Sequence, residues 1–284
     1  MTVPPRKVLV ELFATANLGF LVLDVALAHS ANAFRLWSEW IPVAGAAACA
    51  LALAVGLVRR ARFDEGAGRW IGLGAGGVAV AIGIAGLVLH LDSQFFQTLT
   101  LGGLIYSAPF AAPLAFAGLG LLVLLNRTVP ADTAAWGQWV CLLALGGFAG
   151  NFTLSLADHA QNGFFNVLEW APVFAAAIAV GFFTVAVLAP HSRPLALSLW
   201  VVLLLQATTG ILGFALHLRH LANPEITSLR DRLLYGAPPF APLLFTDLAL
   251  LGALGVWDLQ AKGLLRKAVA PPSAPSAAPA GSPS

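Results

Sequence analysis

Charged side chains are scarce in this sequence. Its 284 residues include only 15 Lys and Arg and 13 Asp and Glu, which is 10% of the chain, whereas an ordinary soluble domain carries about 25%. Because 59% of the residues are hydrophobic and the mean hydropathy is +0.84, the chain has too few polar side chains to cover the surface of a soluble fold. The composition excludes a soluble enzyme and predicts an integral membrane protein whose first partner is the lipid bilayer.

Cysteine and clustered positive charge are also missing. Cys49 and Cys141 are the only cysteines, and both lie in apolar runs, so the sequence indicates no disulfide framework. The net charge is only +2, and no basic stripe interleaved with aromatic residues could follow a phosphate backbone, which excludes nucleic acid as a partner. The sequence contains no nucleophile elbow, phosphate loop, HExxH motif or C-x-x-C-H haem-attachment motif. It therefore leaves open whether the protein is an enzyme.

Long apolar runs dominate what remains. A helix needs about 20 apolar residues to cross a bilayer core of about 30 Å, and eight stretches of that size occur. We therefore predict an all-α polytopic membrane protein with eight transmembrane helices and short connections. The predicted spans are residues 8–30, 41–58, 70–91, 106–126, 135–157, 170–189, 195–217 and 238–258.

The distribution of Lys and Arg predicts the orientation, because basic loops are retained in the cytoplasm. Eleven basic residues fall at one set of span ends and four at the other, so we expect both termini to be cytoplasmic, in a membrane of the bacterial inner-membrane type. Residues 268–284, rich in Pro, Ala and Ser, are expected to form a disordered cytoplasmic tail. The eleven are Arg6, Lys7, Arg59, Arg60, Arg62, Arg69, Arg127, Arg193, Lys262, Arg266 and Lys267; the four are Arg35, Arg219, Arg230 and Arg232.

The two halves of the chain match each other at an offset of about 130 residues, which indicates an internal repeat. Each half has four spans, an even number, so both halves enter the membrane with the same polarity. We predict two fused four-helix bundles, residues 1–130 and 131–267, related by a pseudo-two-fold axis along the membrane normal. The matched residues include His29, Asn32, Phe34, Glu39, Trp40 and Pro42 in the first half, and His159, Asn162, Phe164, Glu169, Trp170 and Pro172 in the second.

Four of the six histidines are matched in this way and end spans on the predicted outer side. His29 and His90 end spans one and three, and His159 and His217 end spans five and seven. Alternate spans of an antiparallel bundle run in the same direction, so the two histidines of each half lie at one depth and can face each other. We expect each pair to bind a haem or a transition metal ion. The alternative is that these side chains only reach for the membrane surface.

The neighbouring residues are compatible with either ligand. For b-type haem, Gly86 and Gly213 lie one turn inward of the second histidine of each half, on the same helix face, and would leave space for the flat ring. For a bare metal ion, Glu39 and Glu169 would add a carboxylate to the two imidazoles. The alternative role of each glutamate is a favourable interaction with the N-terminus of its own helix.

Two carboxylates lie inside predicted spans. Asp24 and Asp247 have no counterpart in the other half, and an ionisable residue within a span usually faces the interior and marks a proton or ion path. Asp24 is about 7.5 Å of helix rise inward from His29 and could relay protons toward the outer site. It could equally be a protonated carboxyl that is bonded to a neighbouring helix.

The plan of two fused four-span bundles, each with a histidine pair near the outer face, resembles that of the haem A synthase family. The likeness covers the number of spans and the approximate spacing of the pairs. The family's Glu-x-x-His-Arg pattern is absent, so we infer no membership and carry over no residue roles. The residues that follow the four histidines here are Ser30, Leu91, Ala160 and Leu218.

Three functions are compatible with these features. The first is a redox or haem-handling membrane protein, which could work with a redox or membrane-complex partner subunit. The second is a transporter that works at the seam between the parallel repeats, with Asp24 and Asp247 on its path. The third is a non-catalytic membrane assembly subunit, in which the repeated residues only hold helix ends together.

Overall fold

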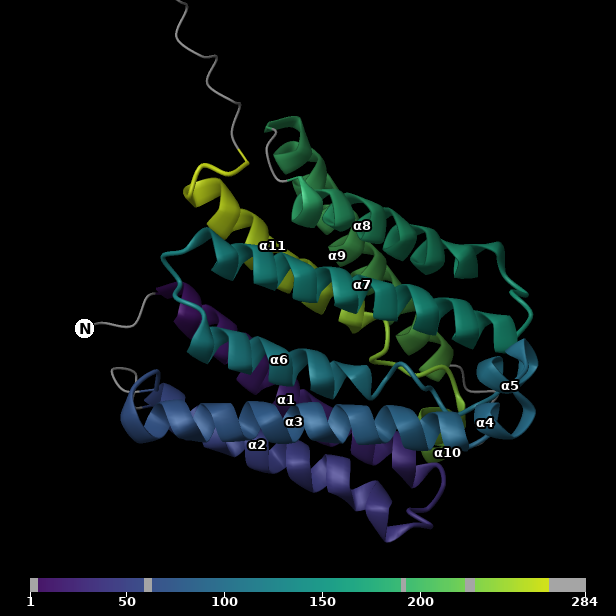
Figure 1. Ribbon diagram of the computed structural model, residues 1–284. Helices are drawn as coiled ribbons and strands as arrows, with labels where there is room; N and C mark the ends of the chain where they lie inside the picture. Colours follow the sequence, from purple (N-terminus) through teal and green to yellow (C-terminus); the bar gives the residue numbers. More distant parts are fainter. Residues whose placement is uncertain (1–4, 59–62, 190–192, 223–227, 266–284) are drawn as a thin grey trace, which may run out of the picture.

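The computed structural model describes residues 5–58, 63–189, 193–222 and 228–265, and its helices confirm the predicted all-α class (Figure 1). No strand occurs within these ranges. The predicted tail, residues 268–284, lies outside the described residues. The helices are α1 (Pro5–Ser30), α2 (Trp40–Val58), α3 (Gly66–Asp92), α4 (Phe95–Thr98), α5 (Leu101–Ile105), α6 (Leu114–Thr128), α7 (Ala134–Gln161), α8 (Trp170–Leu188), α9 (Arg193–Leu221), α10 (Leu229–Tyr235) and α11 (Leu243–Ala261), with single 3-10 turns η1 (Trp37–Glu39) and η2 (Val167–Glu169).

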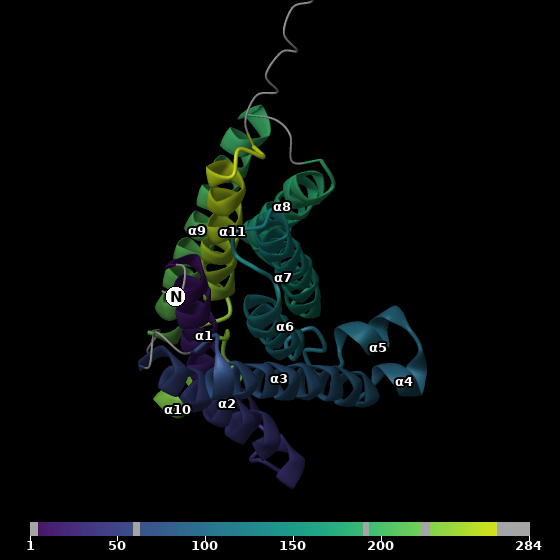
Figure 2. The ribbon, with the colours of Figure 1, turned by 60° about the vertical axis from the view of Figure 1, so that its left-hand side comes forward.

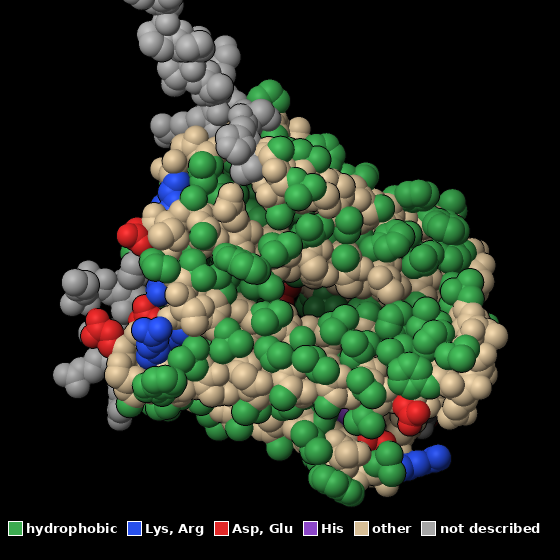
Figure 3. Space-filling model, viewed as in Figure 1, with side chains coloured by type: hydrophobic (Ala, Val, Ile, Leu, Met, Phe, Trp, Pro, Cys, Tyr) green, Lys and Arg blue, Asp and Glu red, His purple; other side chains and the backbone are tan. Residues whose placement is uncertain are grey.

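Seven helices of the described chain are long and apolar enough to cross a membrane, which supports a polytopic membrane protein. Their outward faces carry large apolar side chains: Leu51 and Leu204 are each 68% exposed. Figure 3 shows hydrophobic side chains over most of one face, with charged side chains gathered toward its margins. A soluble monomer rarely exposes apolar patches of more than a few hundred Å². The surface is therefore suited to a lipid bilayer.

Helix α6 differs from its predicted span. We expected residues 106–126, but the helix begins at Leu114 and has 15 residues, which is about 22 Å of helix against a bilayer core of about 30 Å. Pro109 and Pro113 explain the late start, because the residue before a proline is pushed away from helical backbone angles. In the second half α11 likewise begins at Leu243, directly after Pro242, five residues later than predicted.

Four helices of each half pack as a four-cornered bundle (Figures 1 and 2). In the first half α1 and α3 each pack against both α2 and α6, so α1 and α3 occupy opposite corners. In the second half α7 and α9 each pack against both α8 and α11 in the same way. The halves meet along α1 with α11 and α6 with α7, and we call this boundary the seam.

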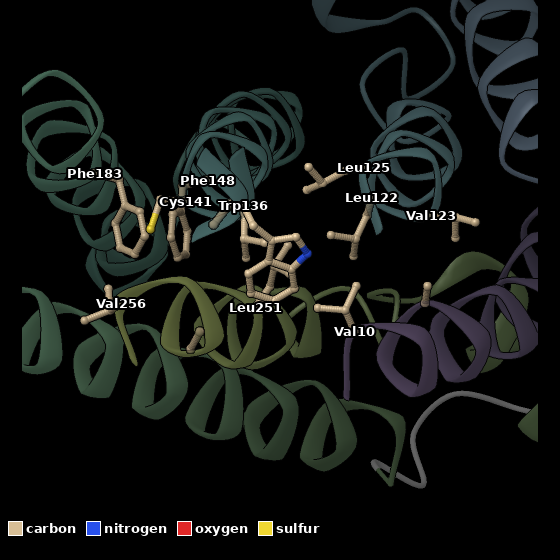
Figure 4. Close-up of a cluster of buried hydrophobic side chains, with 14 of the residues drawn as sticks. Val10, Leu122, Val123, Leu125, Trp136, Cys141, Phe148, Phe183, Leu251 and Val256 are labelled. Atoms are coloured by element: carbon tan, nitrogen blue, oxygen red, sulfur yellow. The ribbon is translucent and has the colours of Figure 1, made fainter. Parts of the chain in front are cut away.

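The seam is tightly packed near the end of the molecule where α1 begins and α11 ends, which we call the terminus end. Figure 4 shows Val10 of α1, Leu122 of α6, Trp136 of α7 and Leu251 of α11 close together, and all four are at most 5% exposed. The two bundles therefore share one hydrophobic core here, which holds the halves against each other.

Candidate functional site

The four matched histidines lie near the C-terminal ends of α1, α3, α7 and α9. We call this the histidine end of the molecule. It is opposite the terminus end, and Gln161 joins the two halves there by donating from Nε2 to the Ile105 carbonyl at 2.6 Å. All four imidazoles are half-buried. Because α1 and α3, and likewise α7 and α9, stand at opposite corners, each pair of histidines lies across the middle of its own bundle.

The first pair is held by backbone carbonyls. His29 Nδ1 donates to the Glu39 carbonyl at 2.9 Å, and His90 Nδ1 donates to the Pro109 carbonyl at 2.9 Å. A carbonyl oxygen can only accept, so the proton of each neutral ring is on Nδ1 and the lone pair is on Nε2. The ring centroids are 6.4 Å apart, with an angle of 61° between the ring planes. The pair therefore has two oriented imidazoles with one lone pair each.

The second pair repeats most of this arrangement. His217 Nδ1 donates to the Pro238 carbonyl at 2.6 Å. His159 Nδ1 lies 3.6 Å from Glu169 Oε2, so it faces a carboxylate rather than a carbonyl. His159 on α7 and His217 on α9 lie across the second bundle from each other. In both halves Nδ1 of each histidine faces an acceptor oxygen.

A short loop follows His29 in the first half and His159 in the second, and it places the acceptor oxygens of Glu39 and Glu169. Phe34 N donates to the His29 carbonyl, and Phe34 has the unusual positive φ of 47°. The Phe34 ring stacks on Trp40, with centroids 3.9 Å apart and planes at 14°. In the second half Phe164, with φ of 49°, stacks on Trp170 at 3.9 Å and 12°. Left-handed backbone at a bulky residue is costly and persists only where the surrounding structure enforces it, and here the stacked indole is the enforcing contact.

The two matched glutamates lie beside the histidines. Glu39 Oε2 and Glu169 Oε2 are buried and lack a hydrogen-bond partner among the described residues. Glu169 is the N-cap residue of α8, yet its side chain makes no capping hydrogen bond. Within the described chain no group of three or more His, Cys, Asp and Glu side chains is close enough together to hold a metal ion. The glutamates are therefore near the imidazoles without completing a three-ligand set.

The two glycines do not border open space. A Cβ on Gly86 would lie 2.8 Å from Pro113 Cβ, and a Cβ on Gly213 would lie 2.9 Å from Pro242 Cβ. The absent side chains let the prolines at the start of α6 and α11 approach α3 and α9. These glycines therefore position the fourth helix of each half, which differs from their predicted role of leaving space for a ring.

The two intramembrane aspartates are both half-buried. The side chain of Asp247 on α11 lies beside that of Asn17 on α1, so it lies at the seam. Asp24 is two helical turns beyond Asn17 on α1 and therefore on the same helix face. Phe20, on that face as well, packs edge-on against Phe240 of the second half at 5.4 Å. The seam thus carries two carboxyl groups toward the histidine end.

A buried charged cluster at the terminus end was missed by the sequence analysis. Glu11 forms a bidentate ion pair with Arg127, and the two side chains are 0% and 1% exposed. Asn126 Nδ2 donates to the Lys7 carbonyl at 2.9 Å, and Lys7 Nζ lies 2.7 Å from Asp64 Oδ2. The sequence alone identifies Lys7 and Arg127 only as orientation signals. Glu11 could have indicated this cluster, because an acidic residue within an apolar span usually faces the interior of the protein, as was argued for Asp24.

A second ion-pair group joins the two halves at the same end. The Asp258 carboxylate, fully buried, binds Arg6 of α1 at 2.6 Å and Lys262 at 2.6 Å. Lys262 Nζ also donates to the Ala131 and Thr133 carbonyls at 2.7 and 2.6 Å. These contacts hold the first turn of α1 against the last turn of α11, and they close the seam at the terminus end.

Comparisons of the chain with protein families, with curated proteins and with solved structures find no match.

Proposed function

We propose that this protein is a membrane haem protein that binds one b-type haem between His29 and His90 and a second between His159 and His217, in a redox or haem-handling role. The observation that carries the proposal is that an acceptor oxygen lies next to Nδ1 of each imidazole. Ligand histidines in metalloproteins almost always donate their second ring N–H to a carbonyl, carboxylate or water, which fixes the tautomer and directs the other nitrogen to the metal. All four matched histidines have Nδ1 next to such an acceptor.

The spacing of the first pair supports two ligands on opposite sides of one ion. With metal–nitrogen distances of about 2.0–2.1 Å, imidazoles on opposite sides have ring centroids roughly 6 Å apart, whereas ligands at a tetrahedral angle bring them roughly 1 Å closer. His29 and His90 have centroids 6.4 Å apart. A haem iron can be held by two histidine side chains, and each half offers two. When bound, the haem would accept and release single electrons.

The buried glutamate oxygens are compatible with this proposal. A buried carboxylate without a hydrogen bond is costly unless a positive charge lies nearby. Ferric iron in a porphyrin dianion carries one net positive charge, which would stabilise Glu39 and Glu169 beside their histidines. A bare transition metal ion held by the same residues is the alternative ligand, and it would need the glutamate as a third donor.

We also propose that eight helices, including the short α6, cross the membrane as two parallel repeats with the histidine end outside. Matched contacts in both halves support the repeat: the Phe–Trp stack, the glycine–proline contact and the carbonyl bond to the second histidine. The excess of Lys and Arg at the terminus end supports the orientation. Because α6 begins only at Leu114, the turn formed by residues 106–113 would carry the chain from the start of α6 to the membrane surface.

An absorption spectrum of the protein purified in mild detergent from haem-supplemented cells tests the function. We expect a Soret band, an α band on reduction, and two haems per chain. His90→Ala and His217→Ala should each remove one haem, whereas His220→Ala, an exposed histidine near the same end of α9, should remove none. If the protein contained stoichiometric metal but no haem, the bound ligand would be a bare metal ion instead of haem. A protein with neither ligand would overturn the proposal.

A further inference from the structure

A groove of about 510 Å³ runs along the seam between α1, α9 and α11. Its walls are almost entirely apolar and include Leu12 and Leu250, which are more than half exposed. Ala16 and Ala253 leave the space that larger side chains would fill. The groove therefore opens sideways, toward the lipid in the proposed orientation. Its size falls within the range of about 300–1,000 Å³ that is typical of small-molecule sites.

One polar pair interrupts this apolar lining. Asn17 and Asp247 both line the groove, and their side chains lie next to each other. Asn17 lies about 18 Å along α1 from Pro5, and Asp247 about 21 Å along α11 from Ala261, at 1.5 Å per residue. Half of a bilayer core is about 15 Å. The pair therefore lies near the midplane.

Two indoles form the opposite end of the groove. Trp200 and Trp257 line it near the terminus end, and Trp257 is about 15 Å of helix rise from Asp247. Trp200 Nε1 donates to Gln260 Oε1 at 3.1 Å, and the Arg6 guanidinium lies over the Trp257 ring at 5.0 Å. The groove thus has a hydrogen-bonding group at one end, an apolar length, and an aromatic end at the membrane surface.

This arrangement selects an uncharged amphipathic ligand. A phospholipid head group carries charge that is expensive to place inside the apolar core, and a fatty acid would place a second carboxylate against Asp247. A hydroxyl or carbonyl head group on a long apolar tail has neither cost. A carboxylate accepts from a hydroxyl, a carboxylic acid donates to a carbonyl, and the Asn17 amide can do either.

We propose that the groove binds a prenylated quinol, with its ring at Asn17 and Asp247 and its tail along the apolar walls toward Trp257. The choice of a quinol among neutral amphipaths rests on the proposed haem function, because a quinol is a lipid-soluble electron donor. Oxidation of the quinol to the quinone breaks two O–H bonds and releases two electrons and two protons. Two one-electron acceptors, which the proposed haems would supply, would take the electrons, while one proton passes to the Asp247 carboxylate and the other to water.

Binding can be measured separately from electron transfer, because a bound quinone quenches nearby indole fluorescence. We would titrate the full-length protein in detergent with decyl-benzoquinone, whose tail replaces the prenyl chain. The expected result is saturable quenching. The Trp200→Phe/Trp257→Phe double variant should lose most of it, although the other indoles remain. Asp247→Leu and Ala253→Phe, which remove the polar pair and fill the groove respectively, should each weaken binding at least tenfold.

The matched control is Asp92→Leu, which removes an exposed carboxylate at the histidine end and should leave the titration unchanged. Quenching that does not saturate, or that persists in Ala253→Phe and Asp247→Leu, would overturn the inference, even in a protein that shows both haems. Saturable quenching that is lost in both groove variants would support the groove even in a protein without haem, in which case only the haem proposal fails. The haem spectrum of each variant is recorded beside its titration to separate these results.

Discussion

Glu11 of α1 and Arg127 of α6 form a bidentate ion pair that is almost completely buried inside the first bundle. The pair is the main polar contact between two helices that share an otherwise apolar interface. Gly72 of α3 lies directly against the guanidinium, and the ring of Phe63 lies 4.7 Å from it. Both charges are therefore removed from water and depend on each other.

Breaking this ion pair should be strongly destabilising. Arg127→Met leaves the Glu11 carboxylate buried without its partner, which typically costs about 3–5 kcal/mol. Removing both charges in Glu11→Leu/Arg127→Met should recover most of that loss, because no buried charge remains. The measurement is the unfolding free energy in mixed detergent micelles. Arg69→Met is the control, since it changes an exposed arginine of the same end, and it should change the unfolding free energy by less than about 0.5 kcal/mol. A loss of similar size in Arg127→Met and Arg69→Met would contradict the role of burial.

Gly86→Ala should disturb the first histidine pair without touching a histidine. The added Cβ would lie 2.8 Å from Pro113 Cβ, so α6 must move, at a cost of about 1–3 kcal/mol. The movement would carry Pro109 and its carbonyl away from His90, and we expect an altered spectrum for the haem of the first half. Gly74→Ala is the matched control, since a Cβ at Gly74 meets no atom within 4 Å. It should leave the spectrum unchanged and raise stability by up to about 1 kcal/mol.

The two proposed haems should respond differently to loss of their glutamates. A carboxylate beside a ligand histidine makes the imidazole a stronger donor and favours ferric iron. Glu169→Gln removes such a carboxylate from His159 and should raise the midpoint potential of the second-half haem. Glu39→Gln retains the backbone carbonyl that accepts from His29, so its effect should be smaller. Redox titration followed at the α band measures both, and equal shifts would count against the assignment of these contacts.

The proposed crossing of α6 can be tested by cysteine labelling in intact cells. The native cysteines are buried and can be replaced by alanine. A cysteine introduced at the exposed Gln97 or at the exposed Asp132 then reports on the two ends of the segment that contains α6. A membrane-impermeant maleimide should label position 97 from outside and position 132 only after lysis. Labelling of both positions in intact cells would show that α6 does not cross, and labelling of position 132 alone would reverse the orientation.

Several features of the candidate site were predictable because they depend on local order along the chain. The matched spacing of histidine, glutamate and tryptophan pointed to the same residues that the structure places together at the histidine end. Their hydrogen-bond acceptors were not predictable, because the Pro109 and Pro238 carbonyls belong to turns that follow other elements. The role of Gly86 was also not predictable from the sequence, because the atoms that occupy the space of its missing side chain belong to a neighbouring segment.

The sequence by itself determined that this chain belongs in a membrane and approximately where seven apolar helices begin and end, because hydrophobicity and proline act locally on a helix. Only the tertiary structure decided which polar residues pair. Glu11 and Arg127 are 116 residues apart, and Arg6 and Asp258 are 252 residues apart. Such pairs form because burial leaves each charge with few available partners, and those partners are set by the packing of whole helices. The same packing brings Asn17 to Asp247 and leaves a groove beside them.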